Sequence, residues 1–216
     1  MNKQFFIDFD GTITTRDTVL TMVENFGGQG WQELNRKWEN KELSTEECAR
    51  ETLKLFRTDL NELQKMLDTI VIDEYFPEFL DLCQSRGFKV YILSDGYDFN
   101  IRNILNRYNI SLPFYSNKLL YTDHFDIECI YINENCSDCG TCKTGLMQQL
   151  QETGSEAVYI GDGYSDTCPA QHADQVFAKS SLLKFCRQNG IKAVPFDNFK
   201  DIIRQIESEI GQSQEN

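Results

Sequence analysis

Acidic side chains gather in short polar segments that each follow an apolar run of the sequence. The segments are DFDGT at residues 8–12, SDG at 94–96 and GDGYSD at 161–166. Two of them hold four candidate carboxylates, those of Asp8, Asp10, Asp162 and Asp166. Gathered in one place, these charges would repel one another unless a cation lay among them. Oxygen ligands with no histidine nearby favour a hard ion, most simply Mg²⁺. A single Asp after a strand is more simply a turn former or a helix N-cap, but three such segments together predict a metal-dependent site.

These segments stand where the strands of a parallel sheet would end. Apolar runs at 3–9, 88–93 and 157–160 are typical of buried strands, and stretches of helical periodicity separate them. Strands that alternate with helices indicate an α/β fold, a Rossmann-like parallel sheet with helices on both faces. Ligands of such sheets bind beyond the carboxyl ends of the strands. We therefore expect the three polar segments to converge on one crevice.

A long stretch with helical periodicity and no convincing strand follows the first strand. Gly27-Gly28 interrupts it, and STEE at 44–47 has the form of a capping box that begins a further helix. We predict that residues 15–77 form an all-helical cap inserted after the first strand. Residues 1–14 and 78–216 then make up the core, so that 216 residues form one domain with an insertion.

The order of these motifs resembles that of the haloacid dehalogenase-like phosphatases. DxDGT comes first, an apolar strand that ends in Ser follows, then a Lys, and then GDGxSD, so the resemblance spans Asp8 to Asp166. Within that superfamily, DFDGTIT with a helical insertion after it is similar to the phosphoserine phosphatase branch. The string CxxCGxCK resembles the phosphatases of methionine salvage, which act on an enol or keto phosphate. The resemblance implies a Mg²⁺-dependent enzyme that hydrolyses a small phosphorylated metabolite through an aspartyl-phosphate.

The resemblance also implies roles for the first acidic segment. Asp8 would be the nucleophile that attacks phosphorus, and Asp10 would be the general acid and then the general base. Mg²⁺ would be held by Asp8, the backbone carbonyl of Asp10, and Asp162.

The remaining implied residues would bind the transferring phosphoryl group. Ser94 and Lys143 would contact its oxygens, and the backbone N–H groups of Asp95 and Gly96 would add donors. Asp166 would not contact the phosphoryl group itself but would orient Lys143 or a metal-bound water.

Two of the implied residues also have plainer interpretations. An isolated lysine is usually a solvated surface charge, but the place of Lys143 at the start of a predicted helix favours it over Lys118 as the site lysine. Asp17 stands where the phosphoserine branch carries an acid that reads the substrate amino group. It is equally well placed as the N-cap of a helix over 18–26, and in a methionine-salvage enzyme it would meet substrate hydroxyl groups.

A cysteine-rich string precedes Lys143. The candidate metal ligands are Cys136, Cys139 and Cys142, with Cys129 or His124 as a fourth. Such a set fits a structural Zn²⁺, and an iron–sulfur cluster needs the same number of ligands. Reduced structural or redox-active thiols are the alternative. Because Lys143 directly follows Cys142, a metal here would fix the loop that aims the lysine.

The charge of the chain narrows the classes of partner. With 21 basic and 34 acidic residues the net charge is −13, and no Lys/Arg-rich run is present, so nucleic acid and anionic membrane surfaces are excluded as partners. No stretch approaches the ~20 apolar residues of a membrane span, and Asp8 interrupts any signal-peptide core. We therefore expect a cytoplasmic protein with reduced thiols.

Three hypotheses about the function follow from these patterns. The first is a phosphatase of the methionine-salvage type, and the second is a phosphoserine phosphatase. The third, from another class, is a non-catalytic metal- or redox-sensing protein that uses the cysteine string. The intact set of Asp8, Asp10, Ser94, Lys143, Asp162 and Asp166 disfavours this third hypothesis. The choice between monomer and homodimer stays open.

Overall fold

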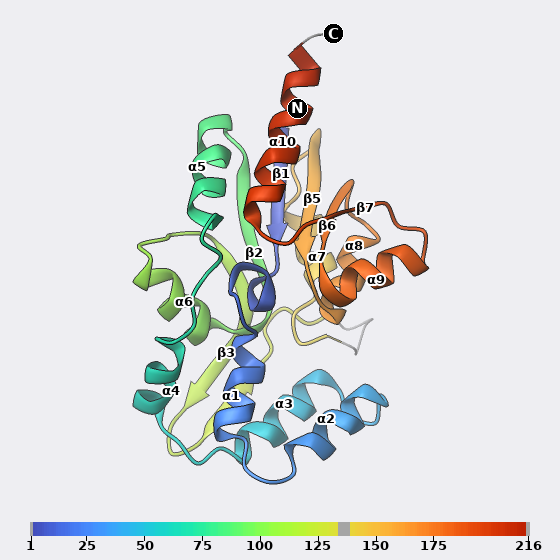
Figure 1. The fold of residues 1–216 in the computed structure, drawn as a ribbon. Helices are drawn as coiled ribbons and strands as arrows, with labels where there is room; N and C mark the ends of the chain where they lie inside the picture. Colours follow the sequence, from blue (N-terminus) through green and yellow to red (C-terminus); the bar gives the residue numbers. More distant parts are fainter. Residues whose placement is uncertain (1, 134–138, 215–216) are drawn as a thin grey trace.

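The computed structural model describes residues 2–133 and 139–214 of the 216. Within them, a seven-stranded sheet runs in the order β4-β3-β2-β1-β5-β6-β7 (Figure 1). The strands are β1 (Asn2–Ile7), β2 (Lys89–Tyr97), β3 (Phe114–Tyr121), β4 (Phe125–Glu128), β5 (Ser155–Gly161), β6 (Gln175–Ala178) and β7 (Ala193–Pro195). Neighbouring strands pair in parallel except β3 and β4, which form an antiparallel hairpin. The predicted α/β class is confirmed.

The register of the three central strands aligns their carboxyl ends. Ile7 at the end of β1 pairs with Ile92 of β2 on one side and with Ile160 of β5 on the other. The polar segments that follow these three residues therefore leave the sheet side by side. The crevice expected from the sequence lies at this edge.

Helices cover both faces of the sheet because alternate residues of a strand point to opposite faces. Phe5 and Ile7 pack into the cluster that includes the apolar residues of α5 and α10, whereas Phe6 packs with Leu146 and Met147 of α7. The α-helices that cover the two faces are α5 (Phe76–Arg86), α6 (Asp98–Arg107), α7 (Lys143–Leu150), α8 (Thr167–Ala170), α9 (Ser180–Gln188) and α10 (Phe199–Gln214).

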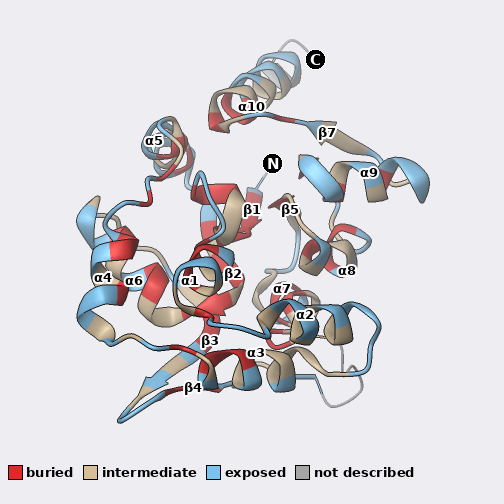
Figure 2. Cartoon of the chain, turned by 60° about the horizontal axis from the view of Figure 1, so that its bottom comes forward, coloured by how far each residue is buried: buried red, intermediate tan, exposed pale blue. Residues whose placement is uncertain are grey.

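Four more helices lie between β1 and α5, at the end of the molecule where α2 and α3 are drawn in Figure 1. They are α1 (Thr18–Phe26), α2 (Trp31–Glu39), α3 (Thr45–Lys54) and α4 (Leu60–Leu67). Ser44 and Glu47 form the predicted capping box of α3. None of the residues of α2 is fully buried, and Figure 2 shows this helix in tan and pale blue against the red of β1.

The two chain segments that join these four helices to the sheet run next to each other. Thr15 donates a backbone hydrogen bond to Val71 over 2.9 Å, and Asp73 donates one to Ile13 over 2.8 Å. The chain thus enters and leaves the four-helix segment through two adjacent connections that are hydrogen-bonded to each other.

The second predicted strand is longer than the sequence indicates. We expected it to end at residue 93, but β2 continues through Ser94, Asp95 and Gly96 to Tyr97. Its register with β3 shifts between Leu93 and Tyr97, so the polar segment is an irregular stretch inside the strand.

None of the helices in the described part of the chain has the length and apolar character of a membrane-spanning helix.

Candidate active site

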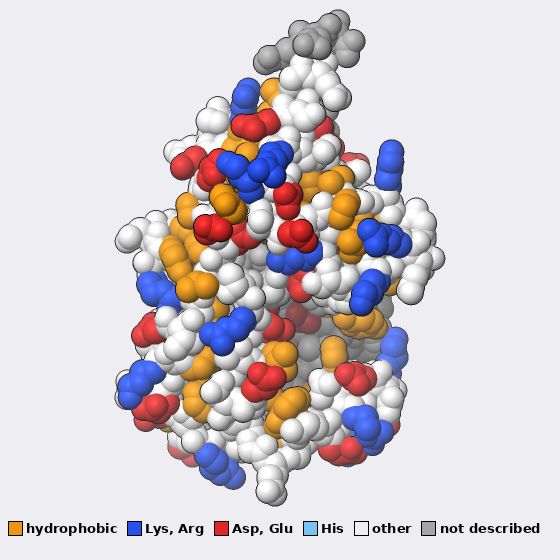
Figure 3. Space-filling model, in the orientation of Figure 1, with side chains coloured by type: hydrophobic (Ala, Val, Ile, Leu, Met, Phe, Trp, Pro, Cys, Tyr) orange, Lys and Arg blue, Asp and Glu red, His pale blue; other side chains and the backbone are white. Residues whose placement is uncertain are grey.

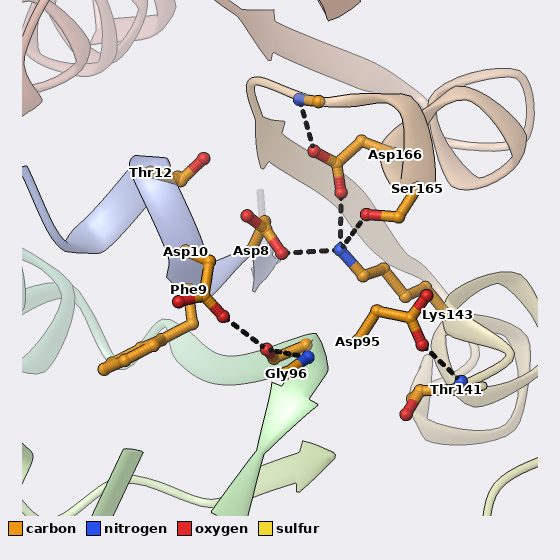
Figure 4. A network of polar contacts seen from close by, with 12 residues as sticks. Asp8, Phe9, Asp10, Thr12, Asp95, Gly96, Thr141, Lys143, Ser165 and Asp166 are labelled. Carbon is orange, nitrogen blue, oxygen red and sulfur yellow. Dashed lines mark hydrogen bonds and ion pairs between the residues drawn. The ribbon is translucent and has the colours of Figure 1, made fainter. Parts of the chain in front are cut away.

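A buried lysine lies at the centre of the crevice, at the N-terminus of α7 (Figure 4). The Nζ of Lys143 lies 2.5 Å from Oδ1 of Asp8, 2.7 Å from Oδ1 of Asp166 and 3.0 Å from Oγ of Ser165. Only 1% of the lysine side chain is exposed. Burial opposes the charge, but the Asp166 and Asp8 carboxylates outweigh it and raise the pKa of Lys143 above its ordinary value. Lys118, the competing lysine, lies in a surface ion pair with Glu128.

Asp166 is held by protein donors on both of its oxygens. Oδ1 accepts from Lys143 and from the Tyr159 hydroxyl at 2.6 Å. Oδ2 accepts from the backbone N–H groups of Asp162 at 3.0 Å and Gly163 at 2.9 Å. A fully buried carboxylate with four donors has little capacity left for a further ligand. Its geometry is that of a residue that orients Lys143.

Asp10 stands apart from the lysine, against the first turn of α1. Its Oδ1 accepts from the Thr18 N–H at 2.8 Å, and its Oδ2 lies 3.4 Å from the Ser94 hydroxyl. Burial and the negative charge of Asp17 raise the pKa of Asp10 to about 7, against the lowering effect of Thr18. A carboxyl group with such a pKa can both release and accept a proton near neutral pH.

The segment after β1 turns sharply so that it can meet the segment after β5. Gly11 adopts a φ of +76°, and a Cβ there would lie 2.9 Å from Oδ2 of Asp162. The next residue, Thr12, donates from its hydroxyl to Oδ1 of Asp162 at 3.0 Å. Only glycine therefore allows this close approach without strain.

Three carboxylates in the described residues, those of Asp8, Asp162 and Asp166, bring one oxygen each within 4.8 Å of one another. Burial and neighbouring carboxylates raise the pKa of Asp8 above its usual value and that of Asp162 to about 6. In both groups burial is the largest cause of the pKa shift, and neighbouring carboxylates add to it. An all-oxygen donor set of this charge fits Mg²⁺. Because Asp166 is saturated with donors, Asp8 and Asp162 are the better ligands.

The SDG segment contributes in two ways. The Ser94 hydroxyl is fully buried and accepts from the Gly96 N–H at 2.9 Å, with Asp10 on its other side. The Asp95 carboxylate accepts from the Thr141 N–H at 2.7 Å, so it anchors the loop that leads into Lys143. Burial raises the pKa of Asp95, while Lys143 and the Thr141 N–H oppose that shift.

A cavity of about 310 Å³ opens over these residues. Asp8, Asp10, Asp95, Gly96 and Asp162 line its floor, and Figure 3 shows acidic side chains inside the hollow. Across the opening, the Trp38 ring of α2 meets the Tyr164 ring edge to face, with centroids 6.2 Å apart.

Asp17 is the N-cap of α1, and its predicted contact with substrate stays a prediction. Its side chain accepts from the Leu20 N–H at 2.8 Å and caps α1, and it also lines the cavity.

The cysteines that are described do not form the predicted metal centre. In residues 2–133 and 139–214, no set of three metal-ligating groups other than the acidic one comes within 4.8 Å. Cys142 Sγ instead accepts from the Gly145 N–H and caps α7, and Cys139 lines the cavity. Cys129 is half-buried against the main core, and His124 lies beside Asp123 on the surface. Cys136 lies outside the described residues. The described residues therefore do not support a structural Zn²⁺, because Cys129, Cys139, Cys142 and His124 bring no three ligand atoms together.

Four residues of the network escaped the sequence analysis. They are Thr12, Thr141, Tyr159 and Ser165. Tyr159 carried one usable signal, a hydroxyl group within an otherwise apolar predicted strand. The others act through a hydroxyl or backbone group whose partner lies far away in the sequence.

Known proteins match nearly the whole chain. The family model of haloacid dehalogenase-like hydrolases matches residues 5–171. The 2-hydroxy-3-keto-5-methylthiopentenyl-1-phosphate phosphatase of Bacillus cereus strain B4264 is 32% identical over 215 residues, which cover 95% of this chain and 96% of that relative. The enzyme of the same name from Bacillus thuringiensis subsp. konkukian strain 97-27 is 31% identical with the same coverage. A phosphoserine phosphatase solved as a phospho-aspartyl intermediate analogue aligns with a TM-score of 0.72 at 20% identity, covering 94% of this chain and 98% of that one.

Proposed function

Since the chain belongs to the haloacid dehalogenase-like hydrolases, we propose that it hydrolyses 2-hydroxy-3-keto-5-methylthiopentenyl 1-phosphate, the substrate named for its relatives. The observation that carries this proposal is the contact between Asp8 and Lys143: Asp8 and Asp10 line the cavity, and the buried Lys143 contacts Asp8 from behind that lining. Asp8 is the anionic nucleophile, Lys143 is the cation, and Asp10 is an acid with a pKa of about 7.

The reaction divides between the two acids of the first segment. An Asp8 oxygen attacks phosphorus while the bond from phosphorus to the leaving oxygen breaks, and Asp10 gives its proton to that oxygen. Asp10 then takes a proton from water, whose oxygen attacks phosphorus and breaks the bond to Asp8. Lys143 binds a phosphoryl oxygen and Asp166 keeps the lysine in place. Asp8, Asp162 and the Asp10 carbonyl would hold Mg²⁺, which would supply positive charge beside the phosphoryl group.

The helices α1–α4 act as the cap in this proposal. The paired connections at Thr15–Val71 and Ile13–Asp73 are the covalent attachment about which the cap can move, and the ion pair of Arg50 on α3 with Asp126 on β4 is a cap–core contact that would have to yield. Closure brings Trp38 over the phosphate and keeps bulk water from the first step.

The charge of the cavity favours this substrate over phosphoserine. No Lys, Arg or His of the described chain lines the cavity, so the carboxylate of phosphoserine has no cation to meet. Asp17 and Asp95 face the same space; they could pair with the ammonium group of phosphoserine but would repel its carboxylate, whereas they can accept a hydrogen bond from the 2-hydroxyl group of the proposed substrate.

Phosphate release from the proposed substrate and from phosphoserine, with and without Mg²⁺, tests the proposal. We expect Mg²⁺-dependent release that prefers the first substrate and falls at least ~10³-fold in Asp8→Asn. Asp123→Asn, which changes an exposed acid beside His124 on the surface, is the matched control and should keep full activity. A preference for phosphoserine contradicts the substrate, and unchanged release by Asp8→Asn contradicts the mechanism.

A further inference from the structure

A second cavity, of about 290 Å³, lies between the helices α1, α2 and α3 and the edge of the sheet. We call it the apolar chamber. Its apolar lining includes Val19, Met22, Trp31, Trp38, Leu53 and Phe56. Its size and its mostly apolar wall are typical of a site for part of a small organic molecule.

The apolar chamber adjoins the cavity over Asp8. Asp17, Val19, Trp38 and Asp95 line both spaces, so they form a shared neck. When the phosphate of a small molecule lies beside Asp8 and Lys143, the rest of that molecule lies next to the neck. Its other end can therefore enter the chamber without any rearrangement of the sheet.

Two polar groups of the chamber are engaged with the protein. The Trp38 indole N–H donates to the Thr45 hydroxyl at 3.0 Å, and the Cys48 thiol donates to the Leu34 carbonyl at 3.6 Å. No Lys, Arg or His of the described chain lines this space, whereas Asp17 and Asp95 do. An anionic end group would lose its hydration there without gaining a cationic partner.

The aromatic and methionine side chains of the chamber favour certain apolar groups of a ligand. Flat rings such as Trp31 and Phe56, together with Met22, suit methylene groups and also the polarisable sulfur of a thioether. A tail that enters the chamber passes Val19 and Trp38, which line both cavities, so we expect an unbranched chain to meet less steric hindrance there than a branched one.

We propose that the apolar chamber binds the unbranched alkyl or thioether tail of a phosphomonoester and that this contact, more than the groups near the phosphate, sets substrate choice. The inference rests on the proposed phosphatase activity at Asp8. It extends that activity to simple n-alkyl phosphates, which share only the phosphate and the tail with the substrate proposed above.

A series of n-alkyl phosphates from methyl to pentyl tests the inference with the full chain and Mg²⁺. We expect kcat/KM to rise about fourfold for each added methylene group, because each one leaves water for an apolar wall. A branched isomer such as neopentyl phosphate should gain much less than the linear pentyl ester.

A variant that fills the chamber gives the structural control. Ala49 on α3 lines the chamber, whereas Glu51 of the same helix is exposed. Ala49→Leu should lower kcat/KM for pentyl phosphate about tenfold and leave methyl phosphate unchanged, which also shows that the variant is folded. Glu51→Leu, which adds a similar side chain on the outer face, should behave as the unmodified chain.

Binding without turnover separates this inference from the proposed function. Calorimetry with methylphosphonate and pentylphosphonate, which are not hydrolysed, should give a Kd at least tenfold lower for the longer compound. Absence of hydrolysis for every phosphate would overturn the proposed function. Hydrolysis or binding that does not depend on chain length, or an equal loss for methyl and pentyl phosphate in Ala49→Leu, would overturn the apolar chamber.

Discussion

Tyr159 donates a hydrogen bond of 2.6 Å to Asp166, and neither residue is exposed to solvent. The tyrosine lies in the middle of β5, two residues before the segment that carries Asp162. Because Asp166 also accepts from Lys143, the tyrosine hydroxyl supports the lysine indirectly. Part of the active site is therefore built from the interior of the sheet.

The first prediction concerns this hydroxyl. Tyr159→Phe removes one donor from Asp166 and leaves Lys143 less firmly oriented. We expect kcat to fall 3- to 10-fold with little change in KM, and the free energy of unfolding to fall by about 1–2 kcal/mol. Steady-state kinetics and urea unfolding measure both. Tyr91→Phe, on β2, which β1 separates from β5, is the control, and a kcat equal to that of the control would show that the hydroxyl has no positioning role.

The second prediction concerns the close approach at Gly11. Gly11→Ala forces a Cβ against Asp162 and also strains a backbone with positive φ. Gly190 has a similar φ of +68° with nothing near its Cβ, so Gly190→Ala reproduces the strain alone. Both variants should lose about 1 kcal/mol of stability, but only Gly11→Ala should weaken Mg²⁺ activation, by tenfold or more. Equal Mg²⁺ titrations for the two would contradict the assignment of Asp162 as a ligand.

The third prediction concerns the pH dependence of the metal-free protein. Burial raises the pKa of Asp162 to about 6 and of Asp10 to about 7, so the folded chain binds protons that the unfolded chain has released. The free energy of unfolding is then greatest at acidic pH and falls as pH rises through about 6 to 7. In EDTA, Tm should fall between roughly pH 5 and 8. Mg²⁺ should reduce that fall, and Asp162→Asn should flatten it without metal; a Tm in EDTA that rises with pH is the contrary result.

The fourth prediction concerns the loop before Lys143. Asp95→Ala removes the acceptor of the Thr141 N–H, so hydrogen exchange at Thr141 should become faster and kcat should fall. Asp98→Ala removes a comparable bond to the Leu119 N–H, away from this loop, and serves as the control. Unchanged exchange at Thr141 in Asp95→Ala would show that other contacts hold the loop.

The sequence predicted the part of the site that depends on strand ends. Apolar runs marked β1, β2 and β5, and parallel order then required Asp8, Ser94 and Asp162 to meet at one edge. The helical segment after β1 followed from its periodicity and from the capping box at Ser44. These are local patterns, which a sequence records directly.

The parts that escaped prediction depend on contacts between distant residues. The extension of β2 through Asp95 comes from renewed pairing of Tyr97 with Asn117 in β3. The spacing of the cysteines indicated a metal centre, but the direction of each thiol depends on the loop, and Cys142 is used as a helix cap. No local pattern shows that the carboxylate of Asp95 accepts from Thr141.

The chain contains two tryptophans, Trp31 and Trp38, and both line the apolar chamber. Trp38 also touches Tyr164 across the opening of the active site. The intrinsic fluorescence of the protein therefore originates where the substrate tail is proposed to bind and where the cap meets the core. Ligand entry and cap movement can be followed by emission from the natural sequence, without an attached dye, and substituting either tryptophan by phenylalanine separates the two signals.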